Sequence, residues 1–529
     1  MTKFFDDGEH HLSRRELLIA GGAGALVLAG CGSGGSSKPS LGASGASAAP
    51  TATPKPGGTL RIGCGGGNAS ESFDAALVNG VAETTRTQVF FEGLTWMDGT
   101  YNVHNWLAEE LTPNKTFDVW TAKLRSGVEF HNGKTIAADD VVFSMNRILD
   151  PKVGATASGQ YINLVAATKK LDQQTVQFQL KFPNAQFPQL LSDVTFIVPV
   201  GYEPKNPVST GPWKFVSFTP GQQMVMKRFE NYWGTKALAD ELILVELPDE
   251  TARVNALLSG EVDAINQVPF VQVPELQQKS GVRVVVSETA GFNPITMRVD
   301  TPPYDDARVR QAIRLLMPRK QVVASALDGQ GTPASDVIGR YSSEAFTGGP
   351  ARELDVEQAK SLLKQAGREN ETFQLVTSPI AAGVVQACEV LAQSAKVAGV
   401  KLVTQQVEPS AYQAKYEKWP FSVDNWVGLP FLVTASIAEG PRAEVVNTTH
   451  FNDPQYNSLF FQAVKQADEG KRAEIVKEMQ KIEYERGGFL NWAFLNTVDA
   501  YSTKVAGYDP VDHTAWGLGR CRLDKLGFV

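Results

Sequence analysis

Alternating apolar and polar residues predict strands in the first part of the chain. Residues 175–180 read Thr-Val-Gln-Phe-Gln-Leu, which places three apolar side chains on one face of an extended segment. Residues 118–124 alternate in the same way, and residues 58–63 form a similar segment after a stretch rich in Gly and Pro. We therefore expect the globular part of the chain to begin with strands near residue 58.

Helical periodicity first occurs at residues 138–149 and dominates after about residue 300. In this first helix Val141, Met145 and Ile148 share one stripe, while Asp139 and Asp140 suit the positive end of the helix dipole. Further helices are predicted after 305, from 355 to a stop at 367, and at 384–397, 456–467 and 471–485, with extended segments at 401–407 and 490–501. This mixture predicts the α/β class, with mixed sheets flanked by helices.

The N-terminus has the features of an export signal. Arg14 and Arg15 precede a short apolar run, as in a twin-arginine signal, although two arginines also serve the general secretory route. The run from 17 to 30 is shorter than the roughly 20 residues that cross a bilayer. It ends in Leu-Ala-Gly-Cys31, which resembles a lipobox and predicts cleavage before Cys31 and a lipid on its sulfur. Residues 32–56 are mainly Gly, Ser, Ala, Thr and Pro, so we expect a flexible tether.

Composition narrows the possible functions. The 529 residues are 43% hydrophobic and 20% charged, with a net charge of -7. This length suits roughly two to four domains. No basic patch suggests nucleic-acid binding. Besides Cys31, only Cys64, Cys388 and Cys521 remain. Their spacing excludes a Cys-x-x-Cys zinc site, and whether any two of them pair stays open.

Motifs for catalysis are weak. Gly133-Lys-Thr lacks the earlier glycine of a phosphate loop. His131 lies in a predicted turn, where a bracing role is expected. Asp139/Asp140 and Asp305/Asp306 occur at helix starts and suit the dipole rather than acid/base chemistry. We therefore expect no enzyme, no cofactor and no metal site.

Several phrases resemble the family 5 extracytoplasmic solute-binding proteins, which are receptors of ABC importers. The resemblance lies in five segments that follow the family order: Pro56–Ile62, Leu124–Ser144 with its Phe-His-Asn-Gly, Ser209–Phe215 followed by Asn231–Gly234, Pro302–Ala312 with Arg-Val-Arg-Gln-Ala, and Asp355–Gly367. It implies a two-lobed clamp like that of periplasmic binding proteins, in the class with an extra domain in the first lobe, closing on a solute.

The resemblance also implies a domain division and partners. With the N-terminal signal, the chain divides into a signal peptide at 1–30, a lipidated cysteine and tether at 31–57, a first lobe from 58–93, 207–291 and 497–529, an inserted domain at 94–206, and a second lobe at 292–496. The expected partners are a small-molecule solute and ABC permease subunits. The expected state is a monomer held by its lipid on the outer, or periplasmic, face of the cell membrane.

Solute contacts are expected mainly around Trp426, which matches the position of a tryptophan on the cleft wall of family members. Peptide-binding relatives follow this tryptophan with an aspartate that pairs with the peptide's amino group. Here the nearest carboxylate, Asp424, precedes it, which argues against an ordinary peptide. An aromatic wall with amide donors suits uncharged or zwitterionic solutes. The full set of predicted ligand-binding residues is Trp426, Asn425, Asp424, Phe292, Asn293, Asn68 from the Gly-rich loop 63–72, and Trp492.

Two other functional classes remain open at this stage. An exported lipoprotein hydrolase would need a nucleophile or a carboxylate pair with a perturbed pKa in the cleft. A receptor that no longer transports would act in signalling or as a chaperone. Family members bind peptides, nickel chelates, opines and oligosaccharides, so the resemblance leaves the identity of the solute open.

Overall fold

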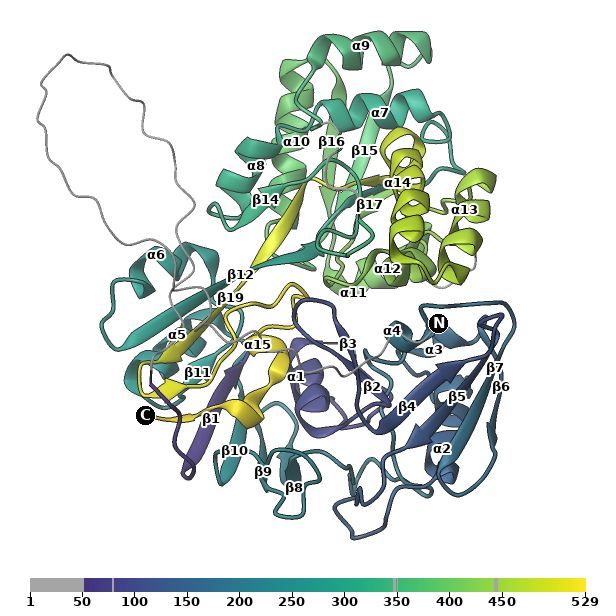
Figure 1. Cartoon of the computed structure of the whole chain (residues 1–529). Coiled ribbons are helices and arrows are strands. Elements are labelled where there is room, and N and C mark those ends of the chain that lie inside the picture. Colours follow the sequence, from purple (N-terminus) through teal and green to yellow (C-terminus); the bar gives the residue numbers. More distant parts are fainter. Residues whose placement is uncertain (1–51, 79, 346–348, 350, 442–445) are drawn as a thin grey trace, which may run out of the picture. The chain divides into compact units, whose positions relative to one another are not determined.

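The structure is a computed structural model that describes residues 52–529, apart from 79, 346–348, 350 and 442–445 (Figure 1). The predicted signal peptide with Arg14 and Arg15, the lipidation site Cys31 and most of the tether lie outside the described residues. Among the residues described, no helix is both long enough and apolar enough to cross a membrane.

A mixed eight-stranded sheet forms the centre of the first lobe. Strand β1 (Thr59–Cys64) runs parallel to its two neighbours, and the remaining pairs are antiparallel. The order is β12 (Val282–Phe292), β19 (Ala493–Ser502), β11 (Ala264–Ile265), β1, β10 (Glu241–Glu246), β9 (Gln223–Arg228) and β8 (Trp213–Thr219), with β14 (Gly331–Pro333) also pairing with β19. Helices α1 (Val81–Phe90) and α5 (Glu250–Ser259) contact β1.

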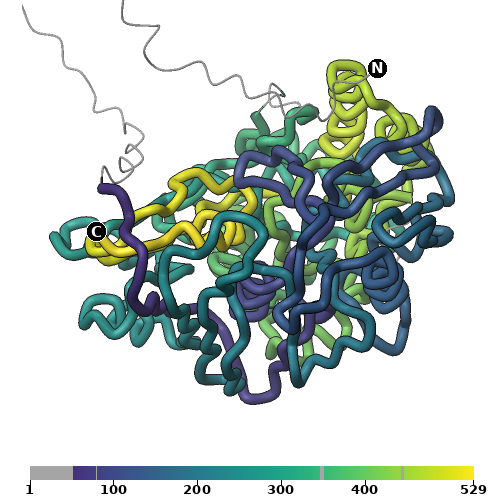
Figure 2. The backbone as a smooth tube through the Cα atoms, turned by 60° about the horizontal axis from the view of Figure 1, so that its bottom comes forward, coloured from purple at the N-terminus to yellow at the C-terminus, as the bar shows by residue number. Residues whose placement is uncertain are grey.

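The chain begins and ends at the same place on this lobe. The N–H of Lys55 donates to the carbonyl of Phe528 at 2.7 Å. Strands β20 (Val505–Ala506) and β21 (Gly527–Phe528) pair beside this contact. Figure 2 shows the C-terminus next to the first residues of the described chain. The C-terminal segment therefore holds the point from which the predicted tether departs.

A separate four-stranded antiparallel sheet lies within residues 94–206. Its order is β4 (Ala108–Pro113), β5 (Val119–Leu124), β7 (Thr175–Leu180) and β6 (Val165–Lys170). Helix α2 (Ala138–Leu149) contacts β6 and β7. The bounds of α2 and β7 match the sequence prediction, because each has one buried face of the expected period. Short helices α3 (Ser158–Tyr161) and α4 (Phe187–Leu190) and the hairpin β2 (Thr95–Met97) and β3 (Val103–Asn105) complete this region.

The second lobe is mainly helical. Its helices, in chain order, are α7 (Ala307–Leu315), α8 (Arg319–Ala326), α9 (Val356–Gln365), α10 (Val384–Val397), α11 (Pro409–Gln413), α12 (Phe431–Ala438), α13 (Pro454–Lys465) and α14 (Glu469–Arg486). They surround the parallel pair β15 (Thr372–Thr377) and β16 (Lys401–Gln406) and the three strands β17 (Phe421–Val423), β13 (Ile295–Met297) and β18 (Phe489–Leu490). Pro318 separates α7 from α8, because a proline cannot continue a helix.

The two long strands β12 and β19 belong to both lobes. They run antiparallel from Val282/Ser502 to Phe292/Phe494, with an irregularity between Glu288 and Phe292 (Figure 1). The predicted boundary at 496/497 therefore falls inside β19. Strand β14, predicted in the second lobe, pairs with this same strand. The division of the chain into these domains stays a prediction.

Two buried carboxyl groups lie together in the second lobe. Glu439 follows α12 and Glu483 lies on α14, and each side chain is buried. The hydroxyl of Tyr456 on α13 donates to Glu483 at 2.9 Å and lies 3.4 Å from Glu439. Burial raises the pKa of both groups, that of Glu439 to about 7, and the two carboxyls hydrogen-bond each other. A shared proton is therefore part of the folded state, because two adjacent charges cannot both be buried here.

Replacing Glu439 with glutamine should flatten the pH dependence of stability. A raised folded pKa means that the contribution of Glu439 is complete below its ordinary value of 4.5 and is lost as the pH rises through about 7. We expect E439Q to match the wild type near pH 5 and to exceed its unfolding free energy by about 2 kcal/mol near pH 8. Urea unfolding at both pH values measures this difference.

The control is Glu478→Gln, because Glu478 is exposed on α14. This variant should keep the slope of the wild type. Equal slopes for E439Q and the wild type would contradict the shared proton.

Candidate functional site

Trp426 meets the end of β12 just after β17. Its N–H donates to the carbonyl of Phe292 at 2.9 Å, and the N–H of Phe292 donates back to Trp426 at 3.0 Å. The two rings are nearly parallel, with centroids 6.5 Å apart at 14°. Trp426 is partly exposed and Asn425 is exposed. The structure thus brings together two predicted site residues from segments more than a hundred positions apart in the chain.

Asp424, by contrast, is saturated by protein donors. Its carboxylate is fully buried and accepts hydrogen bonds from the hydroxyl of Tyr416 at 2.5 Å, the N–H of Asn425 at 2.8 Å, the hydroxyl of Thr448 at 2.9 Å and the indole N–H of Trp426 at 3.1 Å. Burial raises its pKa to about 6, although these hydrogen bonds act in the opposite direction. The structure therefore places Asp424 behind Trp426 rather than at an exposed surface.

Three further predicted residues lie apart from this junction or point into the protein. Trp492 is 0% exposed and packs in the core of the second lobe, which corrects its interpretation as a solute contact. The side-chain amide of Asn293 is almost buried and donates to the carbonyl of Ala382 at 2.9 Å. Asn68 is exposed and closes a local turn by accepting from the N–H and hydroxyl of Ser70.

The Gly-rich loop that carries Asn68 is held in place by a buried ion-pair cluster. Arg86 on α1 pairs with Glu71 of the loop at 2.5 Å and with Glu246 at the end of β10. A Cβ at Gly67 would lie 2.5 Å from the Glu246 carboxylate, so the backbone passes too close for another residue. The loop is thus fixed against the sheet rather than free.

A second group of residues beside Trp426 was missed by the sequence analysis. A Cβ at Gly428 would lie 2.5 Å from the carbonyl oxygen of His513 and 3.0 Å from the hydroxyl of Tyr101. Tyr101 donates to that same carbonyl at 2.7 Å. The His513 ring stacks on Tyr341, with centroids 3.9 Å apart at 11°. Tyr101, Tyr341 and His513, from three segments far apart in the chain, therefore meet near Trp426, and the sequence analysis names none of them.

Glu288 on β12 ties this group to the strand that joins the lobes. Its carboxylate accepts from the hydroxyl of Tyr341 at 2.5 Å and from Arg340 at 3.1 Å. Arg340 also lies over the ring of Tyr341, 4.6 Å from its centroid. Tyr341 has φ of +71°, a conformation uncommon for a bulky residue. Aromatic surface and a charged pair thus flank the crossover strand.

The remaining family-like motifs brace the fold. His131 is 5% exposed, its ring hydrogen-bonds the carbonyl of Gly211 at 2.9 Å, and burial lowers its pKa to about 4. The backbone N–H of His131 donates to Ser209 at 2.8 Å, so the two motifs interlock. This agrees with the bracing role expected of His131.

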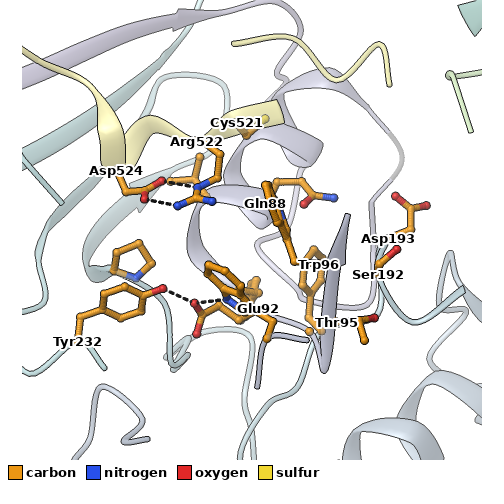
Figure 3. Close-up of a pocket in the computed structure, with 16 residues that line it drawn as sticks. Gln88, Glu92, Thr95, Trp96, Ser192, Asp193, Tyr232, Cys521, Arg522 and Asp524 are labelled. Carbon is orange, nitrogen blue, oxygen red and sulfur yellow. Dashed lines mark hydrogen bonds and ion pairs between the residues drawn. The ribbon is translucent and has the colours of Figure 1, made fainter. Parts of the chain in front are cut away.

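The cavity in Figure 3 is structural as well. It measures about 40 Å³, far below the roughly 300–1,000 Å³ of ligand pockets. Within it, Glu92 accepts from Tyr232 at 2.6 Å, Thr210 at 2.7 Å, Trp106 at 2.8 Å and Trp233 at 3.0 Å. Burial raises the pKa of Glu92. This carboxyl group links the Ser209–Phe215 motif to α1 and is too enclosed to meet a solute.

The described residues contain no group of three or more His, Cys, Asp or Glu side chains placed to hold a metal ion. Cys64, Cys388 and Cys521 are free and buried. Burial raises the pKa of the Cys64 and Cys388 thiols to about 12. The pairing question left open by the sequence is therefore answered: none of these three forms a disulfide in the structure.

A family model for the bacterial extracellular solute-binding proteins, family 5, matches residues 102–436. The chain belongs to this family. The glutathione-binding protein GsiB of Shigella dysenteriae is 24% identical over 447 residues, covering 79% of this chain and 86% of that protein. GsiB of Pectobacterium atrosepticum is 25% identical over 472 residues, covering 84% and 90%.

Solved structures share the fold. The periplasmic binding protein DppA of Helicobacter pylori, in complex with the peptide STSA, has a TM-score of 0.77 at 22% identity, covering 90% of this chain and 98% of that one. AgaA from A. tumefaciens R10, in complex with agropinic acid, has a TM-score of 0.79 at 23% identity, covering 89% and 99%. The predicted two-lobed α/β fold is confirmed by these likenesses.

Proposed function

We propose that this protein is the extracytoplasmic receptor of an ABC importer, which captures a small solute between its lobes and delivers it to the permease. The observation that carries the proposal is the junction at Trp426. An aromatic side chain with exposed surface lies there against the strand that joins the lobes, in a chain of a solute-binding family. Domain closure about such a crossover is a common way to enclose a ligand.

The proposed solutes are peptide-like, opine-like or related small molecules. Trp426 offers an apolar ring and Asn425 an amide, while the carboxylate of Asp424 already holds four protein donors. This combination favours uncharged or zwitterionic solutes over a solute whose amino group must pair with a free carboxylate of the protein. Glutathione, bound by GsiB, and agropinic acid, bound by AgaA, serve as one peptide-like and one opine-like probe.

The proposal includes a location. Cleavage before Cys31 and a lipid on its sulfur would hold the receptor at the outer face of the cell membrane. Residues 32–56 would give it room to reach the permease. The twin-arginine and general secretory routes both remain compatible with Arg14 and Arg15.

Native mass spectrometry of protein purified without refolding tests the proposal. We expect a co-purified small molecule, or a rise in melting temperature that grows with the concentration of glutathione, agropinic acid or a dipeptide. Melting temperatures that stay flat across this panel, with no bound molecule, would contradict the proposed solute classes. Unchanged solute uptake in a strain lacking the protein would contradict delivery to a permease and favour a signalling receptor.

A further inference from the structure

We infer that Asp424 is a positioning residue that fixes the indole of Trp426, so that Trp426 presents its ring, and not its N–H, to the solute. This inference rests on the proposed function for the role of Trp426. The geometry of Asp424 itself does not depend on that role.

The first step is the restraint on Trp426. Its backbone N–H and C=O are both bonded to Phe292, at 2.9 and 3.0 Å. Its indole N–H donates to Asp424 at 3.1 Å. Both ends of the residue are thus held, which leaves the ring little freedom to rotate. Binding sites gain affinity when contact residues are held in place before the ligand arrives.

The second step is the restraint on Asp424. Its backbone N–H donates to the carbonyl of Pro294 at 2.9 Å, and the hydroxyls of Tyr416 and Thr448 hold its two carboxylate oxygens from other segments. The side chain is fully buried. Asp424 therefore joins three parts of the second lobe to the indole and has no exposed oxygen for a solute.

The third step concerns what a solute can meet. An indole carries one N–H donor, and here that donor is used by Asp424. The exposed part of Trp426 can then offer stacking, apolar contact or attraction of a cationic group to the ring face. The part of the solute that meets Trp426 is therefore a planar, apolar or cationic group, and not a hydrogen-bond acceptor seeking the indole.

The first experiment needs no solute. Selective ¹⁵N labelling of tryptophan gives nine indole N–H resonances, one for each tryptophan, and Trp426→Phe identifies the one from Trp426. In Asp424→Asn this resonance should move upfield and its hydrogen should exchange with water about tenfold faster or more. The reason is that a neutral amide is a weaker acceptor than a carboxylate in either orientation.

Thr448→Val is the matched control, because it removes a donor to the same carboxylate oxygen but leaves the indole bond. This variant should keep the position and the exchange rate of the Trp426 resonance. An Asp424→Asn resonance that neither shifts nor exchanges faster would overturn the positioning role. A resonance shift and faster exchange in Thr448→Val as large as those in Asp424→Asn would also overturn it. The effect would then reflect a general loosening of the structure around the carboxylate.

The second experiment uses glutathione and agropinic acid as probes in calorimetry. For a probe that binds, Trp426→Phe should stay within about tenfold of the wild-type affinity, because the aromatic face remains. An equal loss for Trp426→Phe and Trp426→Ala would overturn the inference that the ring alone meets the solute. Absence of binding to either probe would count against the solute classes in the proposed function, while the resonance experiment still decides the role of Asp424.

Discussion

Replacing Arg314 with methionine is expected to lower the unfolding free energy of the second lobe by about 3–5 kcal/mol. Arg314 lies on α7 and is 0% exposed. Its guanidinium donates to the backbone carbonyls of Tyr484 at 3.1 Å, Gly487 at 2.7 Å and Phe489 at 2.6 Å. It also donates to the backbone carbonyl of Glu483 at 3.3 Å. These carbonyls lie in the last turn of α14 or just after it, where, apart from that of Glu483, they are beyond the regular hydrogen bonds of the helix.

Methionine matches the length of the arginine stem but supplies no donor. The carbonyl of Phe489 would lose both guanidinium donors while its residue stays buried, and a buried unsatisfied group costs about 1–3 kcal/mol. The carbonyls of Gly487 and Tyr484 would each lose one of two side-chain donors and keep the other, from Arg310 and Arg352. The positive charge, which suits a helix C-terminus, would also be lost. Burial lowers the pKa of Arg314 to about 9, which leaves the group charged at neutral pH. Urea unfolding followed by circular dichroism measures the loss.

Arg308→Met provides the comparison. Arg308 lies on the same helix and its side chain is 49% exposed, with Asp306 as its partner. Exposed pairs of this kind contribute at most about 1 kcal/mol. Equal urea midpoints for R314M and R308M would contradict the larger contribution to stability expected from the Arg314 contacts at the end of α14.

Replacing Trp426 with alanine is expected to weaken solute binding by about 2–4 kcal/mol, or roughly 30- to 1,000-fold. The ring is the largest partly exposed aromatic group at the junction with β12. Its loss removes a contact surface whose orientation is fixed by Asp424 and Phe292. The fold should survive, because Trp426 only borders the core cluster around Phe431. Calorimetry with whichever molecule co-purifies with the protein measures this loss.

Trp233→Ala is the matched control for this variant. Trp233 is also partly buried, and its indole N–H also donates to a buried carboxylate, that of Glu92, at 3.0 Å. It lies in the first lobe, next in sequence to Tyr232, which lines the 40 Å³ cavity. We expect W233A to lose some stability and keep its solute affinity. If both variants kept full affinity, Trp426 would have no part in binding.

The Arg-Val-Arg-Gln-Ala motif helps to recognise the family from the sequence, but the sequence does not show what these residues contact. Arg310 donates to the carbonyls of Tyr304 and Gly487 and reaches Arg486, and Gln311 donates to Glu485 at 2.7 Å. These contacts cap the end of α14, more than 170 residues later in the chain. No local sequence pattern predicts such a cap, because its donor side chains come from α7, far from α14 in the chain.

Trp492 and Asp424 show the same limit within the site. The sequence analysis places Trp492 among the solute contacts, but its side chain is 0% exposed and packs in the core of the second lobe. Asp424 was considered as a solute partner because it stands two residues from Trp426. Only the approach of Tyr416 and Thr448 from other segments consumes its oxygens.

The sequence by itself determined the family, the α/β class and the bounds of strongly periodic elements. Helices α2 and α10 and strand β7 fall at the predicted residues, because their periods depend only on neighbours along the chain. The tertiary structure alone decided which polar groups are satisfied and which remain exposed. In the tertiary structure Phe292 packs against Trp426, and Asp424 is buried and accepts from the indole N–H. Arg314 donates to carbonyls at the C-terminal end of α14. Each of these outcomes depends on segments far apart in sequence meeting in a desolvated place, where every donor and acceptor must find a partner.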